Sequence, residues 1–239
     1  MTLRDHVALV TGGSGGIGGA LVRRLAAEGL KVAVHYSATR EAAEAVARET
    51  GGVALQADLA VASAAEELVA AVETSLGPVD VLVANHGRSR RRELDREITA
   101  ADWDETFAVN TRAPFLLTQA VLGGMRERGF GRILYTSSVA GLTGGVVGPD
   151  YAASKAALHG LVHHLAPRVA ADGVTVNALA PALIERTAML PGDPGDLAKM
   201  IPVGRLGTPE EIADFAFAVL GNGYLTNHVL PVDGGLHPY

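Results

Sequence analysis

The sequence predicts an α/β fold in which a doubly wound parallel sheet of about seven strands carries helices on both faces. Short runs rich in Val and Leu alternate with longer amphipathic stretches along the whole chain, as in repeated β-α units joined by right-handed crossovers. The short runs are apolar almost throughout, as expected of strands that helices cover on both sides. No repeat, low-complexity tract or linker interrupts the pattern, so residues 1–239 are predicted to form a single domain.

The apolar runs mark the predicted strands, which are His6–Thr11, Lys31–Tyr36, Val53–Asp58, Val79–Asn85, Arg132–Ser137, Val174–Ala180 and His228–Val232. Pro231 lies inside the last run. Because proline cannot donate a hydrogen bond to a neighbouring strand, this strand is predicted to lie at an edge of the sheet.

The amphipathic stretches mark the predicted helices, which are Gly16–Glu28, Arg40–Glu49, Ala64–Leu76, Ala101–Arg128, Tyr151–Ala171 and Pro209–Gly221. Their ends carry the expected signals, because Gly29 follows the first helix, while Thr208 and Pro209 open the last one as an N-cap and a first-turn proline. Pro167 lies within the fifth helix, where its missing N–H is expected to kink or interrupt the helix.

The composition excludes several classes of protein. The chain has no cysteine, so disulfides and thiolate metal sites are excluded, nothing indicates an oxidising compartment, and no metal site is expected. No apolar stretch is long enough for a membrane span, and the first ten residues lack the features of a signal peptide, so a soluble cytoplasmic protein is expected. The formal net charge of −6 opposes general attraction to nucleic acid.

The first strand and the first helix are joined by a glycine-rich segment, Thr11-Gly12-Gly13-Ser14-Gly15-Gly16-Ile17-Gly18. Gly12 permits a tight turn, Gly16 allows the backbone to approach a pyrophosphate, and Gly18 lets the helix pack on the strand. The free N–H groups of the helix N-terminus attract phosphate. The segment therefore predicts a dinucleotide site on a Rossmann-like sheet, with a simple tight turn as the alternative.

The glycine spacing resembles that of the short-chain dehydrogenase/reductase family, and further motifs follow in the family's order. They are Asp58-Leu59, Ala84-Asn85-His86-Gly87, Asn110, Ser138, Tyr151-Ala-Ala-Ser-Lys155, Asn177-Ala-Leu-Ala-Pro181 and Val232-Asp233-Gly234-Gly235. The resemblance covers essentially the whole chain and is strongest to the 3-oxoacyl-[acyl-carrier-protein] reductase-like branch. It implies a nicotinamide-dependent oxidoreductase.

The resemblance and the chemistry of the strand ends together predict the cofactor contacts. They are Gly12, Ser14, Gly15, Gly16, Ile17, Gly18, Ser37, Arg40, Asp58, Leu59, Asn85, Gly87, Tyr151, Lys155, Pro181, Ile184 and Thr187. Before Thr187 the sequence departs from the family pattern by one extra residue and by Ala182 in place of a glycine. His86 replaces a small residue of the family, and it either narrows the cofactor pocket or faces the solvent.

NADP(H) is favoured over NAD(H) as the cofactor. An NAD site places an acid at the end of the second strand to bind the ribose 2′-hydroxyl, but here Ser37, Thr39 and Arg40 precede the first acid, Glu41. The hydroxyl and guanidinium groups suit a 2′-phosphate. Against this, Gly15 stands where many NADP-using relatives carry an arginine, and Arg40 as a solvated surface residue is the alternative.

The predicted catalytic residues are Asn110, Ser138, Tyr151 and Lys155. Reduction of a ketone needs a proton donor and a group that polarises the carbonyl. Tyr151 and Lys155 are four residues apart and share one helix face, so the ammonium and the nicotinamide charge are expected to lower the tyrosine pKa by about three units. Ser138 follows the fifth strand and is expected to bind the substrate oxygen, while the resemblance assigns Asn110 a water that relays protons to Lys155. A surface Tyr–Lys pair is the alternative.

The predicted substrate is a ketone, and in particular a 3-oxoacyl thioester of acyl-carrier protein or coenzyme A. A loop at about residues 183–207 is expected to set the substrate choice. Four arginines follow the fourth strand, namely Arg88, Arg90, Arg91 and Arg92. They either hold an anionic carrier or form a solvated run balanced by Glu93, Asp95 and Glu97. The resemblance implies a homotetramer, and no nucleic-acid or membrane partner is expected.

Two other functions remain open at this point. The first is an alcohol or sugar dehydrogenase of the same family, and the second is a non-catalytic, nicotinamide-binding regulatory protein. The complete catalytic set favours an enzyme, because a sensor needs only the glycine-rich segment.

Overall fold

The computed structural model describes residues 2–89, 98–187, 190 and 195–237. These residues form a parallel sheet of seven strands in the order β3-β2-β1-β4-β5-β6-β7, so the predicted doubly wound α/β fold is confirmed. The strands are β1 Val7–Val10, β2 Lys31–Tyr36, β3 Val53–Gln56, β4 Val79–Ala84, β5 Gly131–Thr136, β6 Val174–Pro181 and β7 Val229–Val232.

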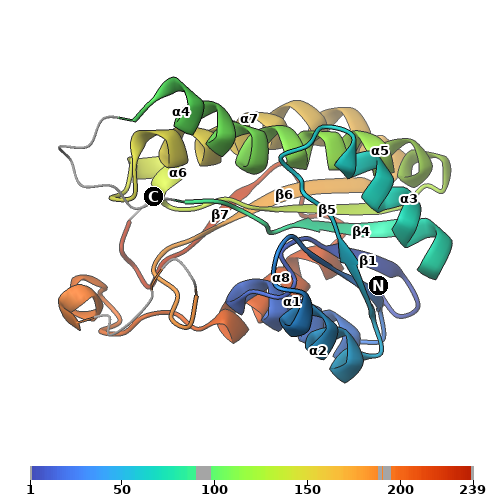
Figure 1. The fold of residues 1–239 in the computed structure, drawn as a ribbon, viewed down its shortest axis with the longest axis horizontal. Coiled ribbons are helices and arrows are strands. Elements are labelled where there is room, and N and C mark those ends of the chain that lie inside the picture. Colours follow the sequence, from blue (N-terminus) through green and yellow to red (C-terminus); the bar gives the residue numbers. More distant parts are fainter. Residues whose placement is uncertain (1, 90–97, 188–189, 191–194, 238–239) are drawn as a thin grey trace.

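Helices cover both faces of the sheet (Figure 1). One layer holds α1, α2 and α8, and the other holds α3, α4, α5 and α7. Their bounds are α1 Gly16–Ala27, α2 Arg40–Thr50, α3 Ala64–Leu76, α4 Ala100–Phe107, α5 Ala113–Glu127, α6 Ala140–Thr143, α7 Pro149–Val169 and α8 Pro209–Gly221, with a π-helical segment η1 Ala108–Arg112 and the short 3-10 helices η2 Ala170–Asp172 and η3 Gly195–Met200.

The sheet separates two apolar cores, one beneath each helical layer. Successive residues of β1 alternate between them, because Ala8 and Val10 belong to one core and Val7 and Leu9 to the other. The prediction that every strand is buried on both faces is wrong for the two edges. The residues of β7 are half-buried, and β3 ends in an exposed Gln56, because an edge strand has a neighbour on one side only.

The two prolines singled out in the sequence have different outcomes. Pro231 lies in the edge strand β7, as predicted. The expected interruption at Pro167 is wrong, because α7 continues through this residue and ends two residues later. Pro167 lies in the last turn of α7, so its missing N–H removes the one bond to the carbonyl of His163, and only two helical residues follow it.

The predicted helix Ala101–Arg128 is divided into three parts. Its first and last parts are the α-helices α4 and α5, and a π-helical turn, η1, lies between them. The N–H of Ala113 donates to the carbonyl of Ala108, five residues earlier. Single π turns of this kind are frequent at functional sites, and this one carries Asn110.

The strand order places the switch point of the sheet between β1 and β4. The chain leaves these two neighbouring strands toward opposite faces, which opens a crevice at their carboxyl ends where ligands bind in such sheets. Among the residues that the structure describes, no helix is long and apolar enough to cross a membrane.

Candidate active site

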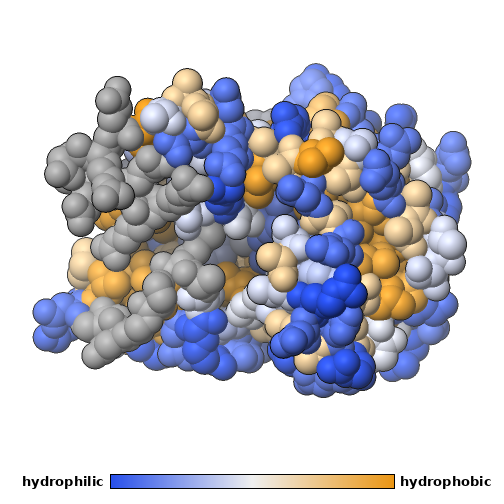
Figure 2. All heavy atoms as spheres, viewed as in Figure 1, coloured by the Kyte–Doolittle hydropathy of each residue, from blue (hydrophilic) through white to orange (hydrophobic). Residues whose placement is uncertain are grey.

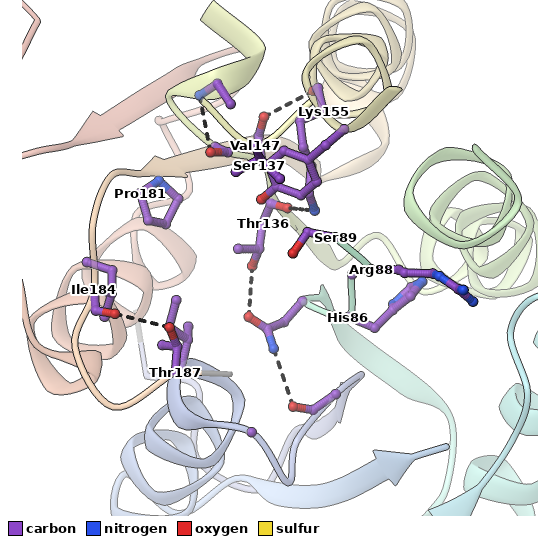
Figure 3. A pocket seen from close by; sticks show the side chains of 18 of the residues that line it. His86, Arg88, Ser89, Thr136, Ser137, Val147, Lys155, Pro181, Ile184 and Thr187 are labelled. Atoms are coloured by element: carbon purple, nitrogen blue, oxygen red, sulfur yellow. Dashed lines mark hydrogen bonds between the residues drawn. The ribbon is translucent and has the colours of Figure 1, made fainter. Parts of the chain in front are cut away.

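A pocket of about 1120 Å³ opens at the carboxyl ends of the strands (Figure 3). It collects residues from both sides of the switch point. Every predicted cofactor and catalytic residue lies within the described part of the chain, and all of them line this pocket except Arg40 and Asn110. The sequence motifs, which are far apart along the chain, therefore meet in one place.

The glycine-rich segment has backbone contacts that only glycine permits. Gly12 has a φ of +64°, a conformation that residues with a side chain rarely adopt. A Cβ at Gly18 would lie 1.9 Å from the carbonyl oxygen of Gly12, and a Cβ at Gly16 would lie 2.4 Å from the carbonyl oxygen of Arg186. The segment is thus a bare backbone cradle at the N-terminus of α1, which suits the phosphates of a dinucleotide.

Asn85 holds three strand ends together. Its Nδ2 donates to the carbonyl oxygen of Thr11, 3.2 Å away, and its Oδ1 accepts from Thr136 Oγ1, also 3.2 Å away. These bonds tie the ends of β1, β4 and β5. Asn85 therefore fixes the floor of the pocket at the switch point.

The sequence reasoning missed His35, the fifth residue of β2. Its Nδ1 accepts a hydrogen bond from the N–H of Gly12 at 3.1 Å, and its Nε2 donates to the carbonyl oxygen of Ala57 at 3.1 Å. Burial lowers the pKa of His35, which keeps the ring neutral and able to accept. The available signal was a histidine inside an otherwise apolar strand, since a buried polar side chain needs a partner.

The residues after β2 only partly match the predicted cofactor contacts. Ser37 lines the pocket, whereas Arg40 is an exposed residue that contacts Glu44 at 3.6 Å and Gln56 at 3.4 Å. Thr39 Oγ1 lies 2.7 Å from Ser14 Oγ of the glycine-rich segment. In the chain alone, Arg40 is therefore a solvated surface residue, which is the alternative that the sequence left open for it.

Tyr151 is buried near the start of α7 and lines the pocket. Burial raises the pKa of its hydroxyl, and a hydrogen bond with Ser138 offsets part of this increase. In the chain alone the pKa of Tyr151 is therefore raised, and the lowering expected from Lys155 together with the nicotinamide charge stays a prediction. Lys155 Nζ lies 5.9 Å from the centre of the tyrosine ring and donates to the carbonyl oxygen of Thr136 at 2.7 Å.

Lys155 is buried, and desolvation lowers its pKa from 10.5 to about 8. Lys155→Met is expected to stabilise the fold near pH 7, with a gain that fades by about pH 10. The lowered pKa means that the charged lysine costs the folded state about 3 kcal/mol below its folded pKa, and that this cost disappears as pH rises to the unfolded value. Urea unfolding of Lys155→Met and of the natural chain from about pH 7 to about pH 10 measures the difference between their free energies of unfolding.

Lys199→Met is the control for this prediction, because the Lys199 side chain is 81% exposed and the substitution removes the same charge. Its stability difference from the natural chain is expected to stay nearly constant with pH. If the difference in the free energy of unfolding between Lys155→Met and the natural chain does not change with pH, the buried lysine carries no desolvation cost.

Asn110 lies behind the pocket and is completely buried. Its Oδ1 accepts from the backbone N–H of Arg88 at 2.7 Å, and its Nδ2 donates to the Arg88 carbonyl oxygen at 2.9 Å and to Ser154 Oγ at 3.0 Å. The side chain therefore joins the segment after β4 to α7, next to Tyr151 and Lys155. A Cβ at Gly87 would lie 3.2 Å from Lys155 Nζ, so a larger residue there would press on the lysine.

The solvent-facing alternative for His86 is wrong, because the residue is 8% exposed and lines the pocket. Its ring contacts Thr11 Oγ1 and the Val109 carbonyl oxygen. Of the predicted arginine run, Arg88 is described and forms an ion pair with Glu105. Arg90, Arg91 and Arg92, with their balancing acids, lie outside the described residues.

The pocket beyond Tyr151 is bordered by apolar side chains from several segments. They are Val146, Val147, Leu190, Leu197, Met200 and Leu236. Val146 is 75% exposed and Met200 65% exposed, and Figure 2 shows apolar atoms at the end of the molecule that carries η3. Part of the predicted substrate loop, including Pro191 and Pro194, lies outside the described residues.

The cradle at the switch point and the buried Tyr–Lys pair define a dinucleotide-dependent oxidoreductase. No group of three or more potential metal-ligating side chains is found where the structure describes the chain. The model of the short chain dehydrogenase family matches residues 6–194. The chain belongs to this family.

Relatives and solved structures agree with this assignment over nearly the full chain. An acetoacetyl-CoA reductase of Rhizobium meliloti is 39% identical, over 97% of this chain and 98% of its own. A 3-oxoacyl-[acyl-carrier-protein] reductase of Synechocystis is 38% identical, over 98% of both chains. A blue fluorescent protein from a metagenomic library, solved in complex with NADPH, is 37% identical with a TM-score of 0.92 and covers 100% of both chains.

Proposed function

We propose that this chain is an NADP(H)-dependent reductase that converts the ketone of a 3-oxoacyl thioester into a secondary alcohol. The observation that carries the proposal is the buried Tyr151 hydroxyl, which is hydrogen-bonded to Ser138 in the pocket that begins at the glycine-rich segment. The similarity to an acetoacetyl-CoA reductase and to a 3-oxoacyl-[acyl-carrier-protein] reductase supports the substrate class.

In the proposed reaction, a bound nicotinamide supplies the hydride that adds to the carbonyl carbon. Ser138 donates a hydrogen bond to the carbonyl oxygen, and Tyr151 donates its proton as negative charge develops there. Because burial raises the Tyr151 pKa, the hydroxyl keeps this proton near neutral pH. The Lys155 ammonium, beneath the tyrosine ring, then stabilises the phenolate that remains.

NADP(H) is the proposed cofactor. The segment after β2 has no acid before Glu41, and Ser37 lines the pocket there. An acid at this position would repel the 2′-phosphate of NADP, so its absence supports a phosphorylated cofactor. Arg40 is the first residue of α2. Its only ion pair among the described residues, with Glu44, is exposed, so the guanidinium can turn to a phosphate without breaking a buried contact.

The apolar border of the pocket favours an acyl chain over a polyhydroxylated sugar. Val147, Leu197 and Leu236 offer contact surface to methylene groups, which gain free energy on leaving water. A sugar would need hydrogen-bonding partners along the same wall. A thioester reductase is therefore preferred here to the sugar dehydrogenase of the same family.

The proposed assembly is a homotetramer in which α4, α5, α7 and the C-terminal region contact other subunits. Trp103 on α4 is 40% exposed and stacks on Phe107, and Phe115 on α5 is 38% exposed. Exposed aromatic side chains are enriched where subunits meet.

The function is tested by following oxidation of the reduced cofactor with acetoacetyl-CoA, using NADPH and NADH in parallel. We expect turnover with NADPH that exceeds turnover with NADH by about tenfold in kcat/KM, the effect of one charge-assisted phosphate contact. Ethyl acetoacetate, which lacks the carrier, is the control substrate. If NADPH binds but no thioester is reduced, the substrate class is wrong and alcohols and sugars are tried next.

A further inference from the structure

The ring of His86 lies between two elements of the site and contacts both. Its Nδ1 is 2.6 Å from Thr11 Oγ1, and its Nε2 is 3.0 Å from the carbonyl oxygen of Val109. A carbonyl oxygen can only accept, so Nε2 carries the proton and donates it to Val109. The lone pair of Nδ1 then accepts from the Thr11 hydroxyl, and both nitrogens of a neutral imidazole are satisfied.

The carbonyl of Val109 needs such a donor because of the local helix geometry. In an α-helix it would accept from the N–H of Ala113, but that N–H donates to Ala108 in the π turn. The residue five positions after Val109 is Pro114, which has no N–H. A buried carbonyl without a donor is costly, and His86 supplies the donor from outside the helix.

The other end of the contact is Thr11, the last residue before the first glycine of the cofactor cradle. Its side chain is completely buried, and its Oγ1 accepts from the backbone N–H groups of Asn85 at 3.0 Å and of His86 at 3.3 Å. The hydroxyl proton goes to His86 Nδ1 at 2.6 Å rather than to the Val83 carbonyl oxygen at 3.3 Å.

The residue after Val109 is Asn110, whose amide donates to Ser154 Oγ on α7. Ser154 Oγ in turn donates to the carbonyl oxygen of Tyr151 at 2.8 Å. Hydrogen bonds and one peptide link therefore run from the cofactor cradle through His86 to the helix of the proposed proton donor. Site residues held by such supporting contacts keep their geometry within narrow limits.

The protonation state of His86 suits this arrangement. Burial, together with the neighbouring His35 and Lys155, lowers the pKa of His86 to about 3. The His35 and His86 rings lie 6.2 Å apart, edge to face. The ring therefore keeps one donor and one acceptor throughout the pH range in which an enzyme is assayed.

We propose that His86 is a positioning residue, which holds the η1 segment of Asn110 in register with the cofactor cradle through its bond to the Val109 carbonyl. The inference rests on the proposed function, because it assigns His86 to the reaction of Tyr151, Lys155 and Asn110.

Two substitutions test the two hydrogen bonds of His86 one at a time. His86→Gln places an amide N–H where Nε2 lies and keeps the donor to Val109, whereas His86→Asn keeps an acceptor near the Nδ1 position and loses that donor. We expect His86→Asn to lower kcat about tenfold with little change in the KM for NADPH, because the Asn110 segment loses the hydrogen bond that positions it while the contact with the cofactor cradle is kept. His86→Gln is expected to keep kcat within about threefold and to raise the KM for NADPH.

Equal losses of kcat in the two variants, or losses that follow their melting temperatures alone, would overturn the proposal. Hydrogen exchange of the backbone at residues 106–115 provides a readout that needs no substrate. His86→Asn is expected to speed exchange there and His86→Gln to leave it slow. If the natural chain reduces no thioester while this difference in exchange is seen, the proposed function fails and the positioning role of His86 stands; unchanged exchange in His86→Asn removes that role.

Discussion

Tyr151→Phe is expected to lower kcat by about 1000-fold, the middle of the range for loss of a general acid. The substitution removes only the hydroxyl, which is buried and hydrogen-bonded to Ser138, so a phenylalanine fits the same space. The affinity for NADPH is expected to remain, because the glycine cradle and Asn85 are untouched. Steady-state kinetics and cofactor binding by fluorescence measure the two effects separately.

Tyr135→Phe is the matched control for this loss. Tyr135 is also completely buried, and its hydroxyl lies 2.7 Å from Thr118 Oγ1 within the core. Its removal is expected to lower the free energy of unfolding by about 1 kcal/mol and to leave kcat within about twofold. A Tyr151→Phe protein that keeps more than a tenth of the natural kcat would refute Tyr151 as the proton donor.

Gly18→Ala is expected to weaken NADPH binding by about 100-fold and to destabilise the fold by about 2–3 kcal/mol. The added methyl would lie 1.9 Å from the Gly12 carbonyl oxygen and 2.8 Å from Asn85 Nδ2. A backbone carbonyl cannot swing aside as a flexible side chain can. The turn at Gly12 must therefore move, and the cradle loses its shape. Calorimetric titration with NADPH and thermal unfolding check the prediction.

Gly160→Ala provides the same chemical change without the clash. Gly160 lies in α7, and a methyl group added there would meet nothing within 4 Å, so alanine is expected to stabilise the helix by up to about 1 kcal/mol. Its NADPH affinity is expected to be that of the natural chain. Near-natural binding by Gly18→Ala would mean that the cradle is not where the cofactor sits.

The sequence predicted the fold and the edge of the sheet at which the site residues meet, because both depend on local features. The period of apolar residues marks strands and helices, and the carboxyl ends of parallel strands share one edge. Gly12 follows the first strand and Gly18 lies in the first turn of the helix after it, while Asn85 follows the fourth strand and Ser138 the fifth. Tyr151 and Lys155 share a helix face because they are four residues apart. Each of these relations is readable over a few residues.

Other predictions failed where the outcome depended on distant parts of the chain. The solvent-facing alternative for His86 ignored the cover that the α4–α5 region provides. The single long helix predicted around Asn110 contains a π turn, which propensity along the sequence does not reveal.

By itself, then, the sequence determined which elements form and at which edge of the sheet the reactive side chains meet, because patterning and strand ends are local properties. The tertiary structure decided which of these groups lose contact with water and which backbone groups need a partner. Burial raises the pKa of Tyr151 and lowers that of Lys155 to about 8. The Val109 carbonyl finds its donor in His86. These effects arise between residues far apart in the chain, so they exist only once the sheet and both helical layers have packed.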